Sequence, residues 1–115
     1  MSGTRASLDW ATYGFSFGER LKYLRRRRKL SQENLAELCG MHRNQISNLE
    51  RNASRDGGSS DPHLSTVYRL AQALRVPPTA LLPNGDSVPL HRSNELARGE
   101  ISFRVVTVRL DELYP

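Results

Sequence analysis

One short stretch of the sequence carries side chains that could read the bases of a nucleic acid. Residues 42–51 are HRNQISNLER. In a helix, Arg43, Asn44, Ser47, Asn48 and Arg51 fall within an arc of about 140°, because successive residues are turned by about 100°. Arginine and asparagine form paired hydrogen bonds with guanine and adenine in the major groove. The candidate base contacts are therefore Arg43, Asn44, Ser47 and Asn48. The alternative is a polar face that meets only solvent.

The distribution of charge favours a polyanionic partner. The 115 residues carry a formal net charge of +5, and residues 24–30 read LRRRRKL. Residues 16–55 contain ten basic and four acidic side chains, whereas residues 86–115 contain four basic and five acidic ones. A basic block beside a nearly neutral tail is typical of proteins that bind a polyanion, although many basic proteins bind none.

Other chemistry has little support in the sequence. Cys39 is the only cysteine, so no internal disulfide can form, and its apolar surroundings favour a buried thiol over a nucleophile. His42, His63 and His91 have no metal-ligand spacing with it. Paired carboxylates and phosphate-binding glycine loops are absent from the sequence. We therefore expect no enzyme activity, no metal site and no cofactor.

The sequence also lacks the apolar segments of secreted and membrane proteins. The first ten residues, MSGTRASLDW, contain no apolar run of the kind found in signal peptides. No run approaches the roughly 18 apolar residues that cross a bilayer. We expect a cytoplasmic protein, associated with the nucleoid, that has no membrane partner.

Capping residues and apolar periodicity predict five helices that position the polar stretch. A capping box of Ser16 and Glu19 predicts the start of the first helix. Ser31 caps the second helix, which ends before Gly40. The third covers residues 42–51, a polar loop follows over residues 51–61, the fourth begins at Leu64, and a short fifth spans residues 78–82. The buried stripe expected on the fourth helix is Leu64, Val67, Tyr68, Ala71 and Leu74, and that on the second is Leu35, Ala36, Leu38 and Cys39.

The two ends of the chain differ from this helical domain, which we assign to residues 16–85. Residues 1–15 form an N-terminal arm, whose aromatic side chains either pack on the helices or contact a second copy. Residues 86–115 form a C-terminal β-strand extension, with strands expected at 87–92 and 101–110. We hypothesise that this extension makes a homodimer. It is also where a protein partner would bind.

Several short motifs, taken in order, resemble the Cro/lambda-repressor-type helix-turn-helix family. They are LSQ at 30–32, the alanine and glycine at 36 and 40, ISNLE at 46–50 and LAQALRV at 70–76. The resemblance covers about residues 16–83. It implies a mainly α fold: a five-helix, lambda-repressor-like DNA-binding domain, often dimeric, here with a short C-terminal β extension. In this family the third helix enters the major groove of DNA.

The resemblance also implies roles for residues outside the base-reading set. Arg25, at the edge of the first helix, is expected to form a salt bridge with Glu50 at the end of the third. Arg26 is expected to face solvent. The candidate phosphate contacts are Gln32, Gln45, Arg51, Arg55 and Arg28.

Three positions depart from the family pattern. Lys29 stands where the family often has glycine, so it is expected to adopt a left-handed backbone conformation at some cost. His42 and His63 stand where Ser or Thr caps are common, and imidazole is a poorer cap.

The sequence therefore predicts a sequence-specific regulator of transcription that binds double-stranded DNA as a homodimer and represses by occupying an operator. Two alternatives stay open. One is the antitoxin of a toxin–antitoxin pair, which uses the same domain and binds a toxin through its tail. The other is a protein-interaction module that uses the domain without DNA.

Overall fold

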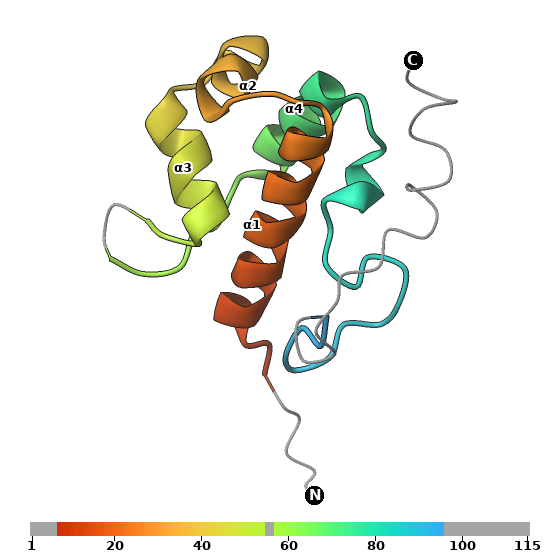
Figure 1. Cartoon of the computed structure of the whole chain (residues 1–115). Coiled ribbons are helices and arrows are strands. Elements are labelled where there is room, and N and C mark those ends of the chain that lie inside the picture. The colour runs from red at the N-terminus through yellow and green to blue at the C-terminus, as the bar shows by residue number, and fades with distance from the viewer. Residues whose placement is uncertain (1–6, 55–56, 96–115) are drawn as a thin grey trace, which may run out of the picture.

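Four α-helices and one 3₁₀ helix form the part of the chain that the computed structural model describes, residues 7–54 and 57–95 (Figure 1). They are α1 (Trp10–Arg27), α2 (Gln32–Cys39), α3 (Arg43–Arg51), α4 (Leu64–Leu74) and the 3₁₀ helix η1 (Pro78–Ala80). The fold is mainly α, and none of the described residues forms a strand. No helix within the described ranges has both the length and the apolar composition needed to cross a membrane.

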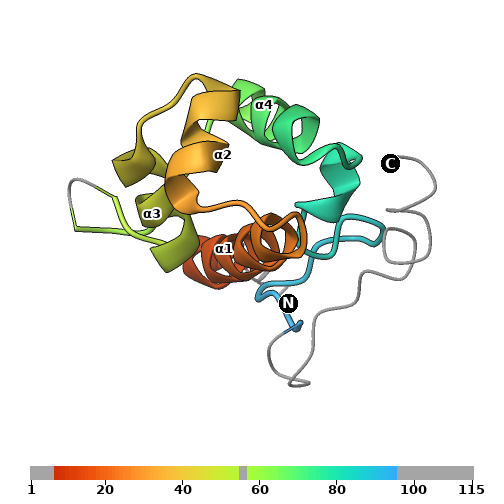
Figure 2. The same cartoon turned by 45° about the horizontal axis from the view of Figure 1, so that its top comes forward.

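The helices surround one apolar core, with α1 packed against α3, and α2 packed against both α3 and α4 (Figure 2). Side chains from all four α-helices are fully buried there: Leu21, Leu24, Leu35, Ile46, Leu70 and Leu74. The buried stripe predicted on α4 is partly wrong, because Leu64 and Tyr68 are exposed while Thr66 and Leu70 are buried. Leu38 of α2 is exposed as well. The buried side of α4 is the one that packs against α2 and η1.

The start of the first helix differs from the prediction. α1 begins at Trp10, with Asp9 as its N-cap, and Ser16 lies in the middle of the helix. Burial overrides the local capping signal, since Tyr13 and Phe17 both enter the interior one turn apart. The Ser16 hydroxyl is buried and hydrogen-bonds the Ser93 hydroxyl at 2.8 Å. The helical domain therefore includes residues that the sequence assigned to an arm.

Two further elements were predicted wrongly. The fifth helix is a single 3₁₀ turn, because Pro77 and Pro78 lack N–H groups and Pro83 follows too soon for an α-helix to extend. Residues 87–92 form no strand, since their carbonyls bond to α1 rather than to another strand: Tyr13 donates to the carbonyl of Leu90 at 2.6 Å. The strand predicted at 101–110 lies outside the described residues.

The turn after α1 has the conformation that the sequence predicted. Lys29 has a φ of 59°, in the left-handed region. The N–H groups of Lys29 and Leu30 bond back to the carbonyls of Arg26 and Arg25, which closes the end of α1. His42 and His63 make no side-chain cap hydrogen bond to their helices.

A C-terminal strap, residues 86–95, is bound along α1 by buried polar groups. Arg20 of α1 pairs with Glu95, with its Nε 3.0 Å from Glu95 Oε1, and both residues are buried. Arg20 also donates to the carbonyl of Ala80 at 2.9 Å. Beside this pair, Ser93 bonds Thr12, Ser16 and Asn84 through its N–H and hydroxyl. The strap therefore belongs to the same packed unit as the helices.

Replacing Glu95 by Gln is expected to lower the free energy of unfolding by about 3 kcal/mol, because the Arg20 charge would then be buried without its partner. Urea unfolding of the full chain measures this change. Asp86→Asn removes the same charge from an exposed position of the strap and should change stability by less than about 0.5 kcal/mol. Equal changes in the free energy of unfolding for the two substitutions would contradict a stabilising role of the buried Arg20–Glu95 pair.

α1 and α3 approach most closely at Gly18. A Cβ at this position would lie 2.6 Å from the carbonyl oxygen of Leu49 and 2.7 Å from that of Glu50. Both oxygens are backbone atoms of α3, so neither can move aside as the end of a flexible side chain would. The absence of a side chain at Gly18 is therefore what permits this helix crossing.

Gly18→Ala is expected to destabilise the protein by about 1–3 kcal/mol through overpacking. The sign of the change in unfolding free energy is informative. Alanine normally stabilises a helix relative to glycine by about 1 kcal/mol, so a loss of stability points to the steric clash. Thermal unfolding followed by circular dichroism measures the change. Gly58→Ala is the matched control, because its added Cβ would have its nearest neighbour 3.8 Å away. An unchanged melting temperature for Gly18→Ala would contradict the close approach of α1 and α3 at this residue.

Candidate nucleic-acid interface

α3 presents a polar face to solvent and an apolar face to the core. Arg43 and Asn44 are exposed, and Ser47 and Asn48 are partly exposed. On the opposite side, Ile46 is fully buried, and Leu49 and Glu50 are buried as well. The four candidate base contacts are therefore brought together on one outer surface.

The turn between α2 and α3 sets the direction of this surface. Gly40 ends α2 with a φ of 67°, a left-handed conformation that glycine adopts without steric cost. The N–H of Met41 then bonds to the carbonyl of Ala36 at 2.9 Å. At the start of α3, the side-chain oxygen of Gln45 accepts the N–H of His42 at 2.8 Å. The side-chain oxygen of the candidate phosphate contact Gln45 is therefore already bound to the N-cap backbone of its own helix.

A buried polar network joins α3 to the two helices before it. Arg25 and Glu50 form the salt bridge expected from the sequence, through two hydrogen bonds of 2.6 and 3.0 Å. Gln32, the first residue of α2, donates to the same carboxylate at 3.0 Å. Glu50 therefore fixes the candidate phosphate contact Gln32 relative to the outer surface of α3.

The remaining candidate phosphate contacts have different surroundings. Arg51 is exposed at the end of α3 and donates to the side-chain oxygen of Asn48 at 2.6 Å. Arg28 is brought to α4 rather than to α3: its guanidinium donates to the carbonyls of Leu74 and Arg75 at 2.8 and 3.1 Å. A cation at these carbonyls is favoured by the dipole of α4. Arg55 lies outside the described residues.

Sequence reasoning missed two residues that hold the segment after α3. Asn52 caps α3 with a φ of 54°, and its side chain bonds the carbonyl of Ala11 and the N–H of Ser60, both at 3.0 Å. Trp10 donates to the carbonyl of Ser60 at 2.6 Å. Asparagine tolerates the left-handed region, so its position after a predicted helix was a usable signal. Trp10 gave no comparable signal.

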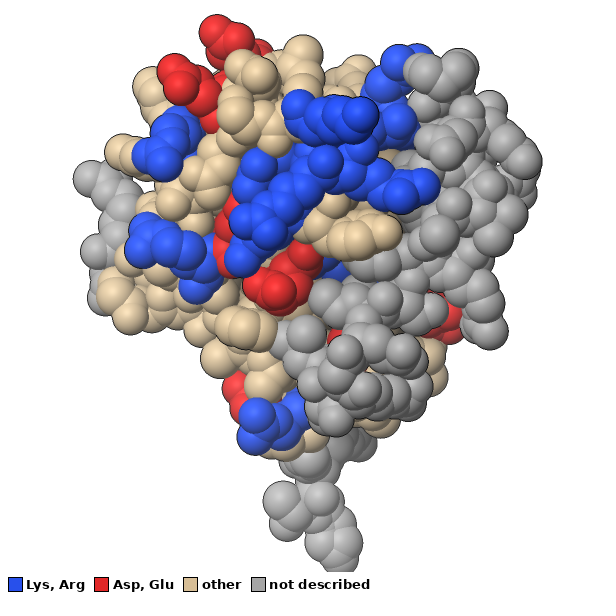
Figure 3. All heavy atoms as spheres, viewed as in Figure 1, with Lys and Arg blue, Asp and Glu red and all other residues tan. Residues whose placement is uncertain are grey.

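Basic side chains gather on the same side of the molecule as the exposed face of α1 (Figure 3).

The one cysteine plays no part in this surface. Burial raises the pKa of the Cys39 thiol, and the charge of Arg69 offsets this only in part. Since the thiolate is the reactive form, the buried side chain is a weak nucleophile near neutral pH. The described residues include no group of three His, Cys, Asp or Glu side chains that could hold a metal ion.

Comparison with known proteins identifies the domain. A family model described as a helix-turn-helix domain matches residues 16–82. The restriction-modification controller protein C.AhdI from Aeromonas hydrophila is 36% identical, with 60% of this chain and 96% of that chain covered and a TM-score of 0.53. No curated protein matches the sequence significantly.

Two other solved structures contain a similar domain in different settings. The master regulator for biofilm formation SinR, determined in complex with DNA, is 26% identical, with 56% of this chain and 95% of that chain covered and a TM-score of 0.50. Hydroxypropylphosphonic acid epoxidase from S. wedmorenis is 27% identical and has a TM-score of 0.53, with 64% of this chain covered. The match covers 36% of the epoxidase, so the similarity concerns one part of that enzyme.

Glu50→Gln is expected to destabilise the protein by about 3–5 kcal/mol, because Arg25 would remain buried without a counter-charge. Differential scanning calorimetry measures the change. Glu37→Gln, an exposed position on α2, is the control and should leave stability nearly unchanged. A melting temperature equal to that of the control would contradict a structural role for the network.

Proposed function

Because the chain belongs to the helix-turn-helix domain family, we propose that it is a regulator of transcription that binds double-stranded DNA in a sequence-specific manner. The observation that carries the proposal is the outer face of α3, where arginine, asparagine and serine side chains stand together opposite a fully buried apolar face. The DNA complex of SinR and the controller role of C.AhdI support it.

In this proposal α3 lies in the major groove. Arg43 and Asn44, at its N-terminal end, contact guanine and adenine edges, and Ser47 and Asn48 contact bases one turn further along. Gln32 meets a phosphate at the N-terminus of α2, where free N–H groups favour an anion. Arg51 and Gln45 contact phosphates of the DNA backbone, and Arg55, outside the described residues, is a further candidate phosphate contact. Arg28, which binds the end of α4, has no assigned part in this scheme.

The proposal includes the oligomeric state and the mode of action. Two copies bind a two-fold symmetric operator, since a single α3 reads only a few base pairs and a dimer doubles the contact. Occupying the operator represses transcription from an overlapping promoter. The protein acts on the nucleoid in the cytoplasm. It catalyses no reaction, and every residue used here binds rather than reacts.

Asn44→Ala tests whether α3 reads bases. We expect it to weaken binding to the preferred duplex by about 1–3 kcal/mol, because the paired hydrogen bonds to one base are lost. Binding to random duplex, which depends mainly on phosphates, should be unchanged. Fluorescence anisotropy measures both affinities, with the preferred duplex first selected from a random library by the full chain.

Asn34→Ala is the matched control, since it removes the same group from an exposed position on α2. Equal losses on preferred and random duplex would exclude a base-reading role for Asn44. Failure of the full chain to bind any duplex would exclude the proposed function as a whole and would favour the protein-interaction module.

A further inference from the structure

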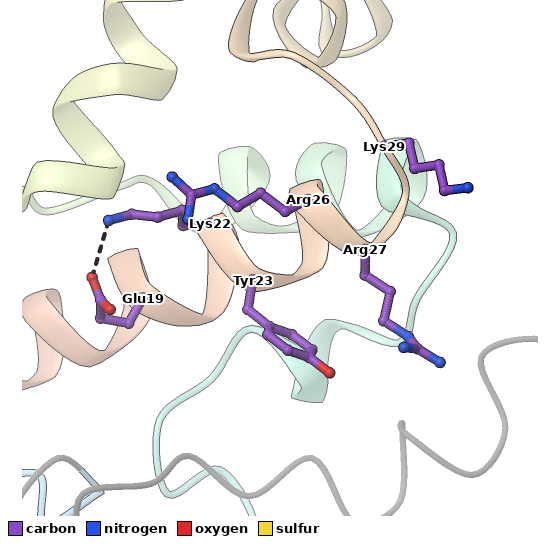
Figure 4. Close-up of a pocket in the computed structure, with 6 residues that line it drawn as sticks. All are labelled: Glu19, Lys22, Tyr23, Arg26, Arg27 and Lys29. Carbon is purple, nitrogen blue, oxygen red and sulfur yellow. Dashed lines mark ion pairs between the residues drawn. The ribbon is translucent and has the colours of Figure 1, made fainter.

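The second half of α1 carries a basic surface that the proposed base and phosphate contacts do not use. A shallow hollow on this helix is lined by four basic side chains with one aromatic and one acidic side chain, namely Lys22, Arg26, Arg27, Lys29, Tyr23 and Glu19 (Figure 4). The family model covers this segment, but nothing in the recognition of bases by α3 requires its charge.

The basic side chains of the hollow point in two directions. Lys22 and Arg26 stand four residues apart on one face of α1, and both extend toward the side on which α3 lies (Figure 4). Arg27 and Lys29 extend the other way (Figure 4). The surface is therefore divided, and only one part of it borders α3.

The network at Glu50 fixes the position of that part. Arg25, the residue before Arg26, is bound to Glu50 of α3, and Glu50 also holds Gln32 at the start of α2. Lys22 and Arg26 lie on α1 close to Arg25 in sequence, and their side chains extend toward the helix that Arg25 contacts (Figure 4). A DNA strand whose phosphate meets Gln32 would continue past these side chains.

Neither positive charge is strongly neutralised within the described part of the chain. Arg26 is exposed, and its side chain has no hydrogen-bond or ion-pair partner among the described residues. Lys22 lies 3.5 Å from Glu19, and each of these side chains is 34% exposed. An exposed pair of this kind contributes only about 0–1 kcal/mol, so it does not prevent Lys22 from meeting another anion.

We propose that Lys22 and Arg26 contact phosphates of the DNA strand that borders the groove occupied by α3, so that α1 extends the protein's contact with the backbone. The inference rests on the proposed function and adds to it a second helix that touches DNA. The DNA backbone is the occupant that the charge and position favour, because the two cations lie beside the reading face rather than on a separate side. An acidic protein surface is the competing occupant.

The double variant Lys22→Gln/Arg26→Gln tests this proposal on the full chain, using the duplex that the unaltered protein selects. Each phosphate contact adds about 0.9 to the slope of log K against log salt concentration, so the slope should fall by about 1.8. Between 50 and 200 mM salt, the unaltered protein should therefore lose about tenfold more affinity than the double variant. Hydroxyl-radical footprinting should show protection shortened at the positions that flank the groove.

Lys29→Asn is the matched control: it removes a charge from the same hollow but from the part that points away from α3, and asparagine tolerates the left-handed backbone at this position. Its salt slope should equal that of the unaltered protein. Circular dichroism of both variants tests whether they are folded, and each single variant, Lys22→Gln or Arg26→Gln, should give about half the effect.

An unchanged salt slope and footprint in the double variant would overturn the inference and leave the proposed function standing, and it would favour an acidic protein partner for this surface. A fall of about 0.9 in the slope for Lys29→Asn, equal to that of either single variant, would also overturn it, because the effect would then reflect net charge rather than position. Absence of any DNA binding by the unaltered protein would instead be a failure of the proposed function.

Discussion

The orientation of α3 depends on the carboxylate of Glu50. It accepts two hydrogen bonds from Arg25 of α1 and one from Gln32 of α2, and its side chain is 2% exposed. Apolar contacts alone would allow α3 to slide or turn within its groove, because they have little directional preference. A buried carboxylate with three donors has one satisfactory arrangement, and leaving any donor unpaired is costly. The network thus specifies one orientation of α3 relative to the helices that precede it.

Close helix contacts give this network its geometry. Gly18 lets the backbone of α1 approach that of α3, and this brings Arg25, two turns later, within reach of Glu50. The left-handed turn at Gly40 directs α3 across α2 and places Gln32 beside the same carboxylate. Each side chain on the inner face of α3 is committed to the core or to the network, so the outer residues alone are left to meet a ligand.

The sequence predicted those elements whose local signals agree with burial. α2 and α3 follow Ser31, Gly40 and the spacing of Ile46 and Leu49, and all of these are consistent with the core. The start of α1 was wrong because the capping signal at Ser16 competes with burial against the strap, and the strap is distant in sequence. Arg20 and Glu95 are separated by 75 residues, and neither has a neighbour in sequence that indicates the other. Pairings of this kind are set by the folded chain and not by periodicity. The common outer surface of the candidate base contacts, by contrast, needed only a helical period and one buried face, and their role as base contacts is what the family resemblance implies.

The arginine-rich end of α1 shows why the density of charge in a sequence says little about its use. Five consecutive basic residues have at least three structural roles here. Arg25 is buried against Glu50, Arg28 binds the carbonyl end of α4, and Lys29 forms the turn. The helical turn of about 100° per residue sends neighbouring side chains in different directions, so each meets a different partner. A basic side chain that pairs with a buried carboxylate stabilises the fold. A basic side chain that is exposed to solvent can still contact a phosphate. The use of each basic residue is therefore decided by its angle around α1: Arg25 is buried against Glu50, whereas the next residue, Arg26, is exposed and lines the hollow.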